Sequence, residues 1–131
     1  MIKLSTRCRY GMIAIAELAK QYNKEPLSAE EIFRKHRIPK SYLEQLLVRL
    51  RRHNLISSQR GPQGGFILKK HPRKITVLEI INALEGPLDL VACCKQSCWN
   101  IDGCLTRSIW LDLNKSLNAV LRKKTLADIV R

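Results

Sequence analysis

A glycine-rich turn between two short β-prone runs constrains the fold of this chain more than any other feature. The turn is Arg60–Gly65 (RGPQGG), and the flanking runs are Leu55–Gln59 and Phe66–Lys70. Three glycines and a proline in this turn permit a tight reversal and a close approach of the backbone to another molecule. The pattern therefore predicts a β-hairpin with a glycine-rich tip.

The sequence before this hairpin predicts two helices with clear start signals. The first runs to about Gln21 and shows apolar residues at helical spacing, and Ser5 or Thr6 can cap its first turn. The second covers Ala29–His36, because residues 28–31 (SAEE) match the capping-box pattern.

A third helix follows and ends before Asn54. Pro39 can be its first helical residue, or Ser41 can cap it, because residues 41–44 (SYLE) match another capping box. Four leucines recur on one face at helical spacing, and we expect them to point inward: Leu43, Leu46, Leu47 and Leu50.

After the hairpin, a fourth helix begins at Thr76 (TVLE) and ends at a Gly-Pro pair. Residues 88–103 have no period. Residues 104–124 predict a long amphipathic helix, because leucine or isoleucine recurs every fourth residue. A capping box at Thr125 (TLAD) predicts a short last helix.

This order predicts a mainly α fold with a small β-hairpin, in a winged helix-turn-helix arrangement. In that arrangement the second helix of the pair enters the major groove of DNA, and the wing reaches an adjacent groove or the phosphates. We expect a winged helix-turn-helix domain at residues 1–86, a cysteine-rich loop at 87–103, and the long helix with the short last helix at 104–131.

Charge supports a nucleic-acid partner. The chain carries a net +13, of which residues 1–75 hold +12 and residues 76–131 hold +1. Such an excess favours nucleic acid first and an anionic membrane surface second. No uncharged apolar run approaches the roughly 18 residues of a membrane span, so we expect a cytoplasmic protein without a membrane partner. No pattern for a small-molecule substrate or a catalytic centre is found.

The third helix carries side chains suited to reading bases. Gln45 can pair with adenine, Glu44 can accept from cytosine, and Ser41 is adaptable. Arg49 suits phosphate or guanine, and Tyr42 can contact the DNA backbone. A basic helix face is often only solvated surface, but here charge, hairpin and helix order agree.

The wing adds a second candidate contact. Arg60 precedes Gly61 at the tip, where an arginine can enter a narrow minor groove. Gly61 and Gly64 would let the backbone approach DNA closely.

Tyr10 is expected in the core. We expect three scattered histidines on the surface, since they have no ligand spacing: His36, His53 and His71.

Four of the five cysteines lie within twelve residues: Cys93, Cys94, Cys98 and Cys104. Thiolates are soft ligands suited to zinc or an iron–sulfur cluster. Zinc sites favour paired C-x2-C turns, which are absent here, so the spacing favours a cluster over zinc or free thiols. Cys8, in the first helix, is expected to be a small buried apolar residue.

The chain resembles the Rrf2 family of bacterial winged-helix regulators through residues 6–11 (TRCRYG), 41–46 (SYLEQL), 60–65 (RGPQGG) and 84–87 (LEGP). The resemblance implies a homodimeric transcription factor, not an enzyme, whose long C-terminal helix swaps across the dimer. It also implies that Ser41, Glu44 and Gln45 read a double-stranded DNA operator while Arg60 enters the minor groove.

Residues 98–110 resemble the cluster-binding branch of this family. That branch implies a [2Fe–2S] or, alternatively, a [4Fe–4S] cluster that tunes operator choice, with iron–sulfur biogenesis genes as targets. The matching ligands are Cys93, Cys98 and Cys104, although Cys94 could replace Cys93. The branch has a histidine ligand where this chain has Arg107, whose guanidinium cannot bind iron. The fourth-ligand options are Cys94, Asp102 and a Cys8 of the partner subunit.

A second interpretation keeps the winged-helix dimer but removes the cluster. Cysteine-metabolism regulators of the same family lack the cluster ligands, and such a protein would sense thiol oxidation, nitric oxide or cysteine supply. Cys93, Cys94 and Cys98 would then be the responsive thiols.

Overall fold

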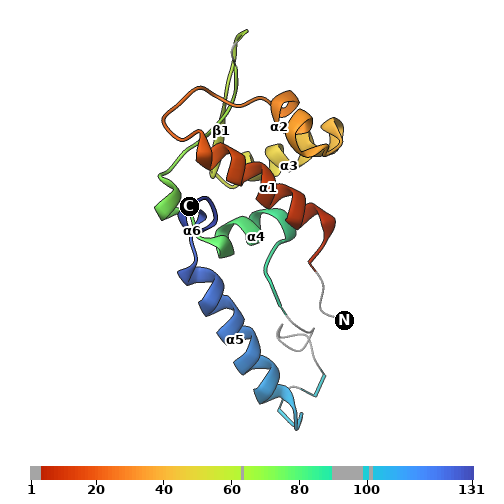
Figure 1. The fold of residues 1–131 in the computed structure, drawn as a ribbon. Helices are drawn as coiled ribbons and strands as arrows, with labels where there is room; N and C mark the ends of the chain where they lie inside the picture. Colours follow the sequence, from red (N-terminus) through yellow and green to blue (C-terminus); the bar gives the residue numbers. More distant parts are fainter. Residues whose placement is uncertain (1–3, 63, 90–98, 101) are drawn as a thin grey trace.

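The computed structural model describes residues 4–62, 64–89, 99–100 and 102–131. The N-terminal helices and the hairpin, up to residue 86, come first and are called the head here. The two C-terminal helices follow them (Figure 1). In chain order the elements are α1 (Thr6–Lys20), α2 (Ala29–His36), α3 (Lys40–Arg52), β1 (Ile56–Gln59), β2 (Gly65–Leu68), the 3-10 turn η1 (Pro72–Lys74), α4 (Val77–Glu85), α5 (Arg107–Lys123) and α6 (Leu126–Ile129).

The predicted helix starts are confirmed where a side chain caps the first turn. Ser5 Oγ accepts from the Cys8 amide at 3.3 Å, and Ser28 Oγ accepts from the Glu31 amide at 3.2 Å. Thr76 and its partner three residues on, Glu79, form the complete reciprocal capping box. These caps satisfy amides that a helix cannot pair internally.

The start of α3 differs from both predicted alternatives. Pro39 lies just outside the helix with φ −50° and ψ 129°, and no side chain caps it. The first intrahelical bond runs from the Leu43 amide to the Pro39 carbonyl at 2.9 Å. Proline has no amide to satisfy and its φ is preset, so the helix begins directly after it. Ser41 is therefore a helical residue with an exposed side chain and is not a cap.

The wing is an antiparallel hairpin in which Ile56 pairs with Leu68 and Gln59 pairs with Gly65. Leu27 adds an isolated bridge to Phe66 through two backbone hydrogen bonds of 3.1 and 2.8 Å. A Cβ on Gly65 would lie 2.6 Å from the Leu27 carbonyl group. Glycine at this position therefore lets the segment before α2 close onto the wing.

The core lies where α1, α3 and α4 meet the base of the hairpin, and apolar side chains fill it. Tyr10 packs against this core, as predicted. Leu126 of α6 is also buried in it. The Leu126 amide donates to the Ile75 carbonyl at 2.8 Å, so the chain returns to the head after α5.

The long helix is shorter than expected, because it begins at Arg107 and not at Cys104. The Thr106 hydroxyl accepts from Trp110 Nε1 at 3.2 Å and caps no amide. Residues 102–106 form turns before it. Figure 1 shows α5 extending away from the head.

The mainly α fold with one small hairpin is as predicted. Among the helices described, none combines the length and apolarity needed to cross a bilayer.

Candidate DNA interface and cysteine site

The two faces of α3 differ in burial. Its four leucines are buried, as the spacing predicted. The opposite face borders an open hollow of about 690 Å³. Every DNA-contact candidate of the helix lies there except Tyr42, and the lining side chains are Ser41, Glu44, Gln45, Val48, Arg49, Arg52 and His53.

Polar groups on this face have free hydrogen-bonding capacity. In the part of the chain that the structure describes, the side chains of Glu44, Gln45 and Arg49 make no hydrogen bond or ion pair. All three are exposed. They can therefore donate to or accept from a ligand without breaking an internal contact.

The start of α1 lies beside this face. Tyr42, Gln45 and Arg49 share a second hollow, of about 390 Å³, with residues 5–7. The Tyr42 ring contacts Tyr10 edge to face, with centroids 6.1 Å apart. Tyr42 is thus fixed between the core and the hollow.

Arg7 is a site residue that the helical pattern did not identify. It is half-buried and lines the same hollow as Gln45 and Arg49. Its position adds a positive charge where the start of α1 meets α3. The only signal in the sequence was its place in the TRCRYG motif at residues 6–11.

The wing carries Arg60 on a turn that requires glycine. Gly61 has φ +115°, a conformation that other residues rarely adopt. A Cβ on Gly64 would lie 2.3 Å from the Gln59 carbonyl oxygen. Arg60 is exposed, and the hairpin projects beyond the helices in Figure 1. Gly61 and Gly64 therefore shape the turn that presents Arg60, and their contact with DNA stays a prediction.

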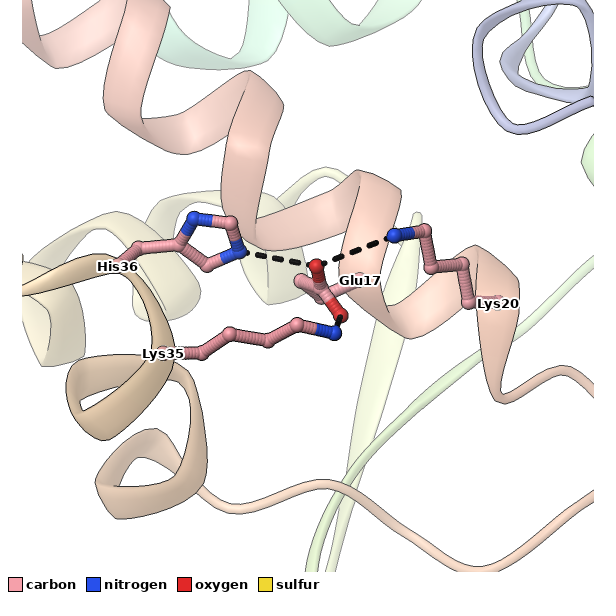
Figure 2. A network of polar contacts seen from close by, with 4 residues as sticks. All are labelled: Glu17, Lys20, Lys35 and His36. Atoms are coloured by element: carbon pink, nitrogen blue, oxygen red, sulfur yellow. Dashed lines mark hydrogen bonds and ion pairs between the residues drawn. The ribbon is translucent and has the colours of Figure 1, made fainter.

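A buried carboxylate holds α2 against α1 (Figure 2). Glu17 Oε1 accepts from His36 Nε2 at 2.9 Å, and Glu17 Oε2 accepts from Lys35 Nζ at 3.0 Å. Lys20 Nζ lies 3.5 Å from Glu17 Oε1. His36 is therefore not simply a surface residue, and the expectation for it was wrong. His53 and His71 are exposed, as expected.

These contacts also determine the charge of Glu17. Burial alone would raise its pKa, but the hydrogen bonds from His36 and Lys35 and the charges of Lys35 and Lys20 outweigh burial and lower the pKa below its usual value. The carboxylate is ionised at neutral pH. It positions α2 and, through the left-handed turn at Arg37 (φ 59°), the helix that follows.

Cys104 has the chemistry expected of a thiolate ligand. Hydrogen bonds from the Thr106 side chain and backbone, with the Arg107 amide and charge, lower its pKa below the usual value of a thiol. Its Sγ lies 3.6 Å from Thr106 Oγ1. A thiolate is the form of cysteine that binds iron.

The other predicted ligands differ in what can be said of them. Cys93, Cys94 and Cys98 lie outside the described residues. Asp102 is exposed, close to Cys104 in the chain. Cys8 is buried, and burial with the nearby charge of Glu85 raises its pKa, which favours a neutral thiol. The residues described contain no group of three or more His, Cys, Asp or Glu side chains placed to hold a metal ion.

An apolar stripe on α5 is exposed in the part of the chain that the structure describes. Ile109, Leu113 and Val120 are 53%, 47% and 55% exposed, and no residue of α5 is buried. Isolated apolar side chains on a surface are ordinary. A stripe along a seventeen-residue helix is instead typical of a helix that packs on a partner.

Residues 4–131 match the Rrf2 family, described as "Iron-dependent Transcriptional regulator". The HTH-type transcriptional regulator IscR of Sodalis glossinidius is 37% identical over 130 residues, which cover 98% of this chain and 79% of that protein. The solved structure of IscR from T. potens has a TM-score of 0.80 and 38% identity, and covers 98% of this chain and 86% of that chain.

The structure of CymR, the global cysteine regulator of B. subtilis, has a TM-score of 0.84 and 35% identity, with 99% of this chain and 97% of that chain covered. The solved structures of IscR and CymR share the mainly α fold of this chain. The family match spans nearly all of the sequence. The chain belongs to the Rrf2 family of transcriptional regulators and is similar to IscR.

Proposed function

We propose that the protein is a homodimeric, sequence-specific DNA-binding regulator whose choice of operator depends on a cysteine-ligated iron–sulfur cluster. The exposed face of α3 carries the DNA-binding part of the proposal. Its Glu44, Gln45 and Arg49 have no partner among the described residues. Arg60 is presented on the same head by a turn in which Gly61 has a backbone conformation that other residues rarely adopt.

The side chains divide into base-reading and backbone-binding groups. Ser41, Glu44 and Gln45 lie toward the start of α3, which is the part of a recognition helix that reaches base edges. Gln45 suits adenine and Glu44 suits the amino group of cytosine. Arg49 lies beside the start of α1, where it suits a phosphate. Tyr42, which lines the same hollow as Arg49, would contact the DNA backbone.

Arg60 would enter the minor groove beside the groove that α3 occupies. An arginine there responds to groove width, and therefore to sequence, without reading a base directly. The head carries most of the positive charge of the chain, +12 in residues 1–75. Two such heads would suit a two-fold-symmetric operator.

The stripe on α5 supports a second copy of the chain as the partner. Ile109, Leu113 and Val120 are exposed along one helix. Two such helices packed together would remove this apolar surface from water, which stabilises association by about 25 cal/mol per Å² buried. An α5 from each copy would place one head on either side of the dimer axis.

Cys104 supports the cluster part of the proposal, because its thiol is biased toward the thiolate. Cys98, Cys104 and either Cys93 or Cys94 would hold the cluster, with Asp102, Cys94 or the partner subunit's Cys8 as the fourth-ligand options. A bound [2Fe–2S] cluster, with [4Fe–4S] as the alternative, supplies a redox-active group that is lost or oxidised when conditions change. Thr106 and Arg107, beside Cys104, lower the pKa of its thiol.

Operator selection from random DNA tests the whole proposal. Anaerobically purified protein with bound iron and sulfide, and the same protein after metal removal, would each be used to select sequences. We expect both to enrich two-fold-symmetric sites, with different preferences for the two forms. Cys104→Ala is the matched variant and should select the sites of the metal-free protein.

Two results would overturn the proposal in separable ways. A colourless anaerobic preparation without iron contradicts the cluster and leaves DNA binding standing. Enrichment of no sequence in either form contradicts base reading by α3.

A cluster-free alternative is favoured by one observation, the lowered pKa of Cys104, since a thiolate also reacts with oxidants. The likeness to the cysteine regulator CymR agrees with it. In this case Cys93, Cys94 and Cys98 would respond to oxidation, nitric oxide or cysteine supply. Mass spectrometry of the thiols after peroxide treatment, beside iron analysis, separates the two mechanisms.

A further inference from the structure

Two asparagines one turn apart on α5 face the segment that leaves α4. Asn114 and Asn118 are both half-buried. Asparagine is among the weaker helix formers, so its presence at two half-buried positions of one helix calls for a tertiary reason. The hydrogen bonds of the two side chains supply one.

Both amides reach out from the helix. Asn118 Nδ2 donates to the Leu88 carbonyl at 3.4 Å and to the Asn114 carbonyl of its own helix at 2.8 Å. Asn114 Nδ2 donates to Asp89 Oδ1 at 3.3 Å. A carboxamide nitrogen has two hydrogens, and Asn118 uses both. We call Asn114, Asn118, Leu88 and Asp89 the asparagine clamp.

The clamp holds the chain just after the end of α4. Leu88 and Asp89 follow the end of α4 at Gly86, and in the sequence they directly precede residues 90–98, which contain three of the five cysteines. Cys104 lies three residues before Arg107, the first residue of α5. The stretch with the four clustered cysteines is therefore anchored to α5 at both ends, once through the backbone and once through the clamp.

We propose that Asn114 and Asn118 are positioning residues for the cysteine-bearing stretch, a role that rests on the proposed function. Anchoring both ends of a chain segment lowers the entropy lost when groups within it gather on one ligand. The clamp therefore helps the thiols to hold a cluster.

A donor–acceptor exchange tests the clamp. Asn114→Asp places a second carboxylate against Asp89, whereas the double variant Asn114→Asp/Asp89→Asn restores a donor and an acceptor in reversed order. The first measurement is chemical denaturation of the metal-free protein. We expect the folding equilibrium constant to be about tenfold smaller in the single variant, from loss of a hydrogen bond to a charged group, and to recover in the double variant.

Asn82→Ala is the matched control. Asn82 lines the same open hollow of about 330 Å³ as Asn114 and Asn118. Among the described residues its side chain makes no hydrogen bond. The folding equilibrium constant of this variant should equal that of the wild type. An effect as large as that of Asn114→Asp would assign the change to the hollow and refute the clamp.

The second measurement is the rate of iron release to a chelator from the anaerobically loaded protein. We expect faster release from Asn114→Asp and recovery in the double variant. Equal stability of all variants refutes the clamp, and changed stability with unchanged iron release refutes its role toward the thiols. If the wild type retains no iron, the proposed cluster function fails, whereas the denaturation data still decide whether the asparagines hold Leu88 and Asp89.

Discussion

Glu17 Oε1 accepts a hydrogen bond from His36 Nε2 at 2.9 Å, and this contact joins α1 to the last residue of α2. The helix that carries the proposed base-reading side chains begins four residues later, at Lys40. A displacement of α2 would therefore move α3 relative to the core. The position of the DNA-binding face depends on a carboxylate that touches no DNA.

Glu17→Gln is expected to lower the free energy of unfolding by about 1–3 kcal/mol, because the charge that pairs with His36 and Lys35 is lost from a buried position. Only 7% of the Glu17 side chain is exposed. Glu30→Gln is the matched control, since Glu30 pairs with Arg34 and Lys40 at 40% exposure. Surface pairs contribute little, so chemical denaturation should show a far smaller loss for the control. Equal losses would show that burial of Glu17 is unimportant.

The stability that Glu17 contributes is expected to disappear in acid. Its pKa in the folded protein lies below the usual value of 4.5, because hydrogen bonds and charges outweigh burial. The unfolded chain then binds the proton first, so the contribution is present above that value and falls as the pH drops through the lower folded pKa. The stabilities of wild type and Glu17→Gln should therefore begin to approach each other below about pH 4.5 and become equal only below the lower folded pKa. A constant difference at all pH values would contradict the assignment.

Arg60→Ala is expected to weaken operator binding by about 1–3 kcal/mol and to reduce the salt dependence by about one charge. The reason is the exposed position of Arg60 on the wing. Lys123→Ala removes the same charge from the exposed end of α5 and serves as the control. Binding isotherms at several salt concentrations provide the measurement. The wing assignment is wrong if the two variants lose the same affinity.

Gln45→Ala should relax sequence preference more than it weakens binding. A bidentate contact to a base edge is worth about 1–3 kcal/mol of discrimination, and Gln45 lies unpaired on the exposed face of α3. Arg49→Ala should instead weaken all sequences alike, since its guanidinium suits a phosphate. Competition between the selected operator and single-base variants distinguishes the two effects. Uniform weakening by Gln45→Ala would remove Gln45 from the base-reading set.

Local sequence signals predicted most helix boundaries, because a cap involves residues close together in the chain. Ser5, Ser28 and Thr76 each bind an amide three residues away. The inward leucines of α3 followed from spacing alone. The start of α3 was missed because the pattern at Ser41 also permits a cap, and the bond from Leu43 to Pro39 decided against it.

Contacts between distant residues could not be predicted from such signals. The bridge between Leu27 and Phe66 and the burial of Leu126 in the head depend on how the chain folds back. The Glu17–His36 contact spans nineteen positions. For the site, the exposed residues of α3 followed from the helical period, whereas Arg7 joins them only because α1 packs beside α3. The ligand set among the cysteines stays a prediction.

Cys104 and Cys8 are expected to react very differently with iodoacetamide in the metal-free protein. The hydrogen bond from Thr106 is the largest cause of the lowered pKa of Cys104, whereas burial is the largest cause of the raised pKa of Cys8. Since the thiolate is the reactive form, Cys104 should be alkylated at a lower pH than an ordinary cysteine. Cys8 should stay unmodified until the protein unfolds, which makes it an internal control.

Thr106→Val removes the side-chain hydrogen bond and keeps the size of the residue. The midpoint pH for alkylation of Cys104 should rise toward that of a free cysteine, and mass spectrometry of the modified peptide measures it. A smaller thiolate fraction should also slow iron loading, because metal ligation requires a deprotonated thiol. An unchanged midpoint would show that the groups left in the variant, which are the backbone amide of residue 106 and the amide and charge of Arg107, are sufficient to lower this pKa.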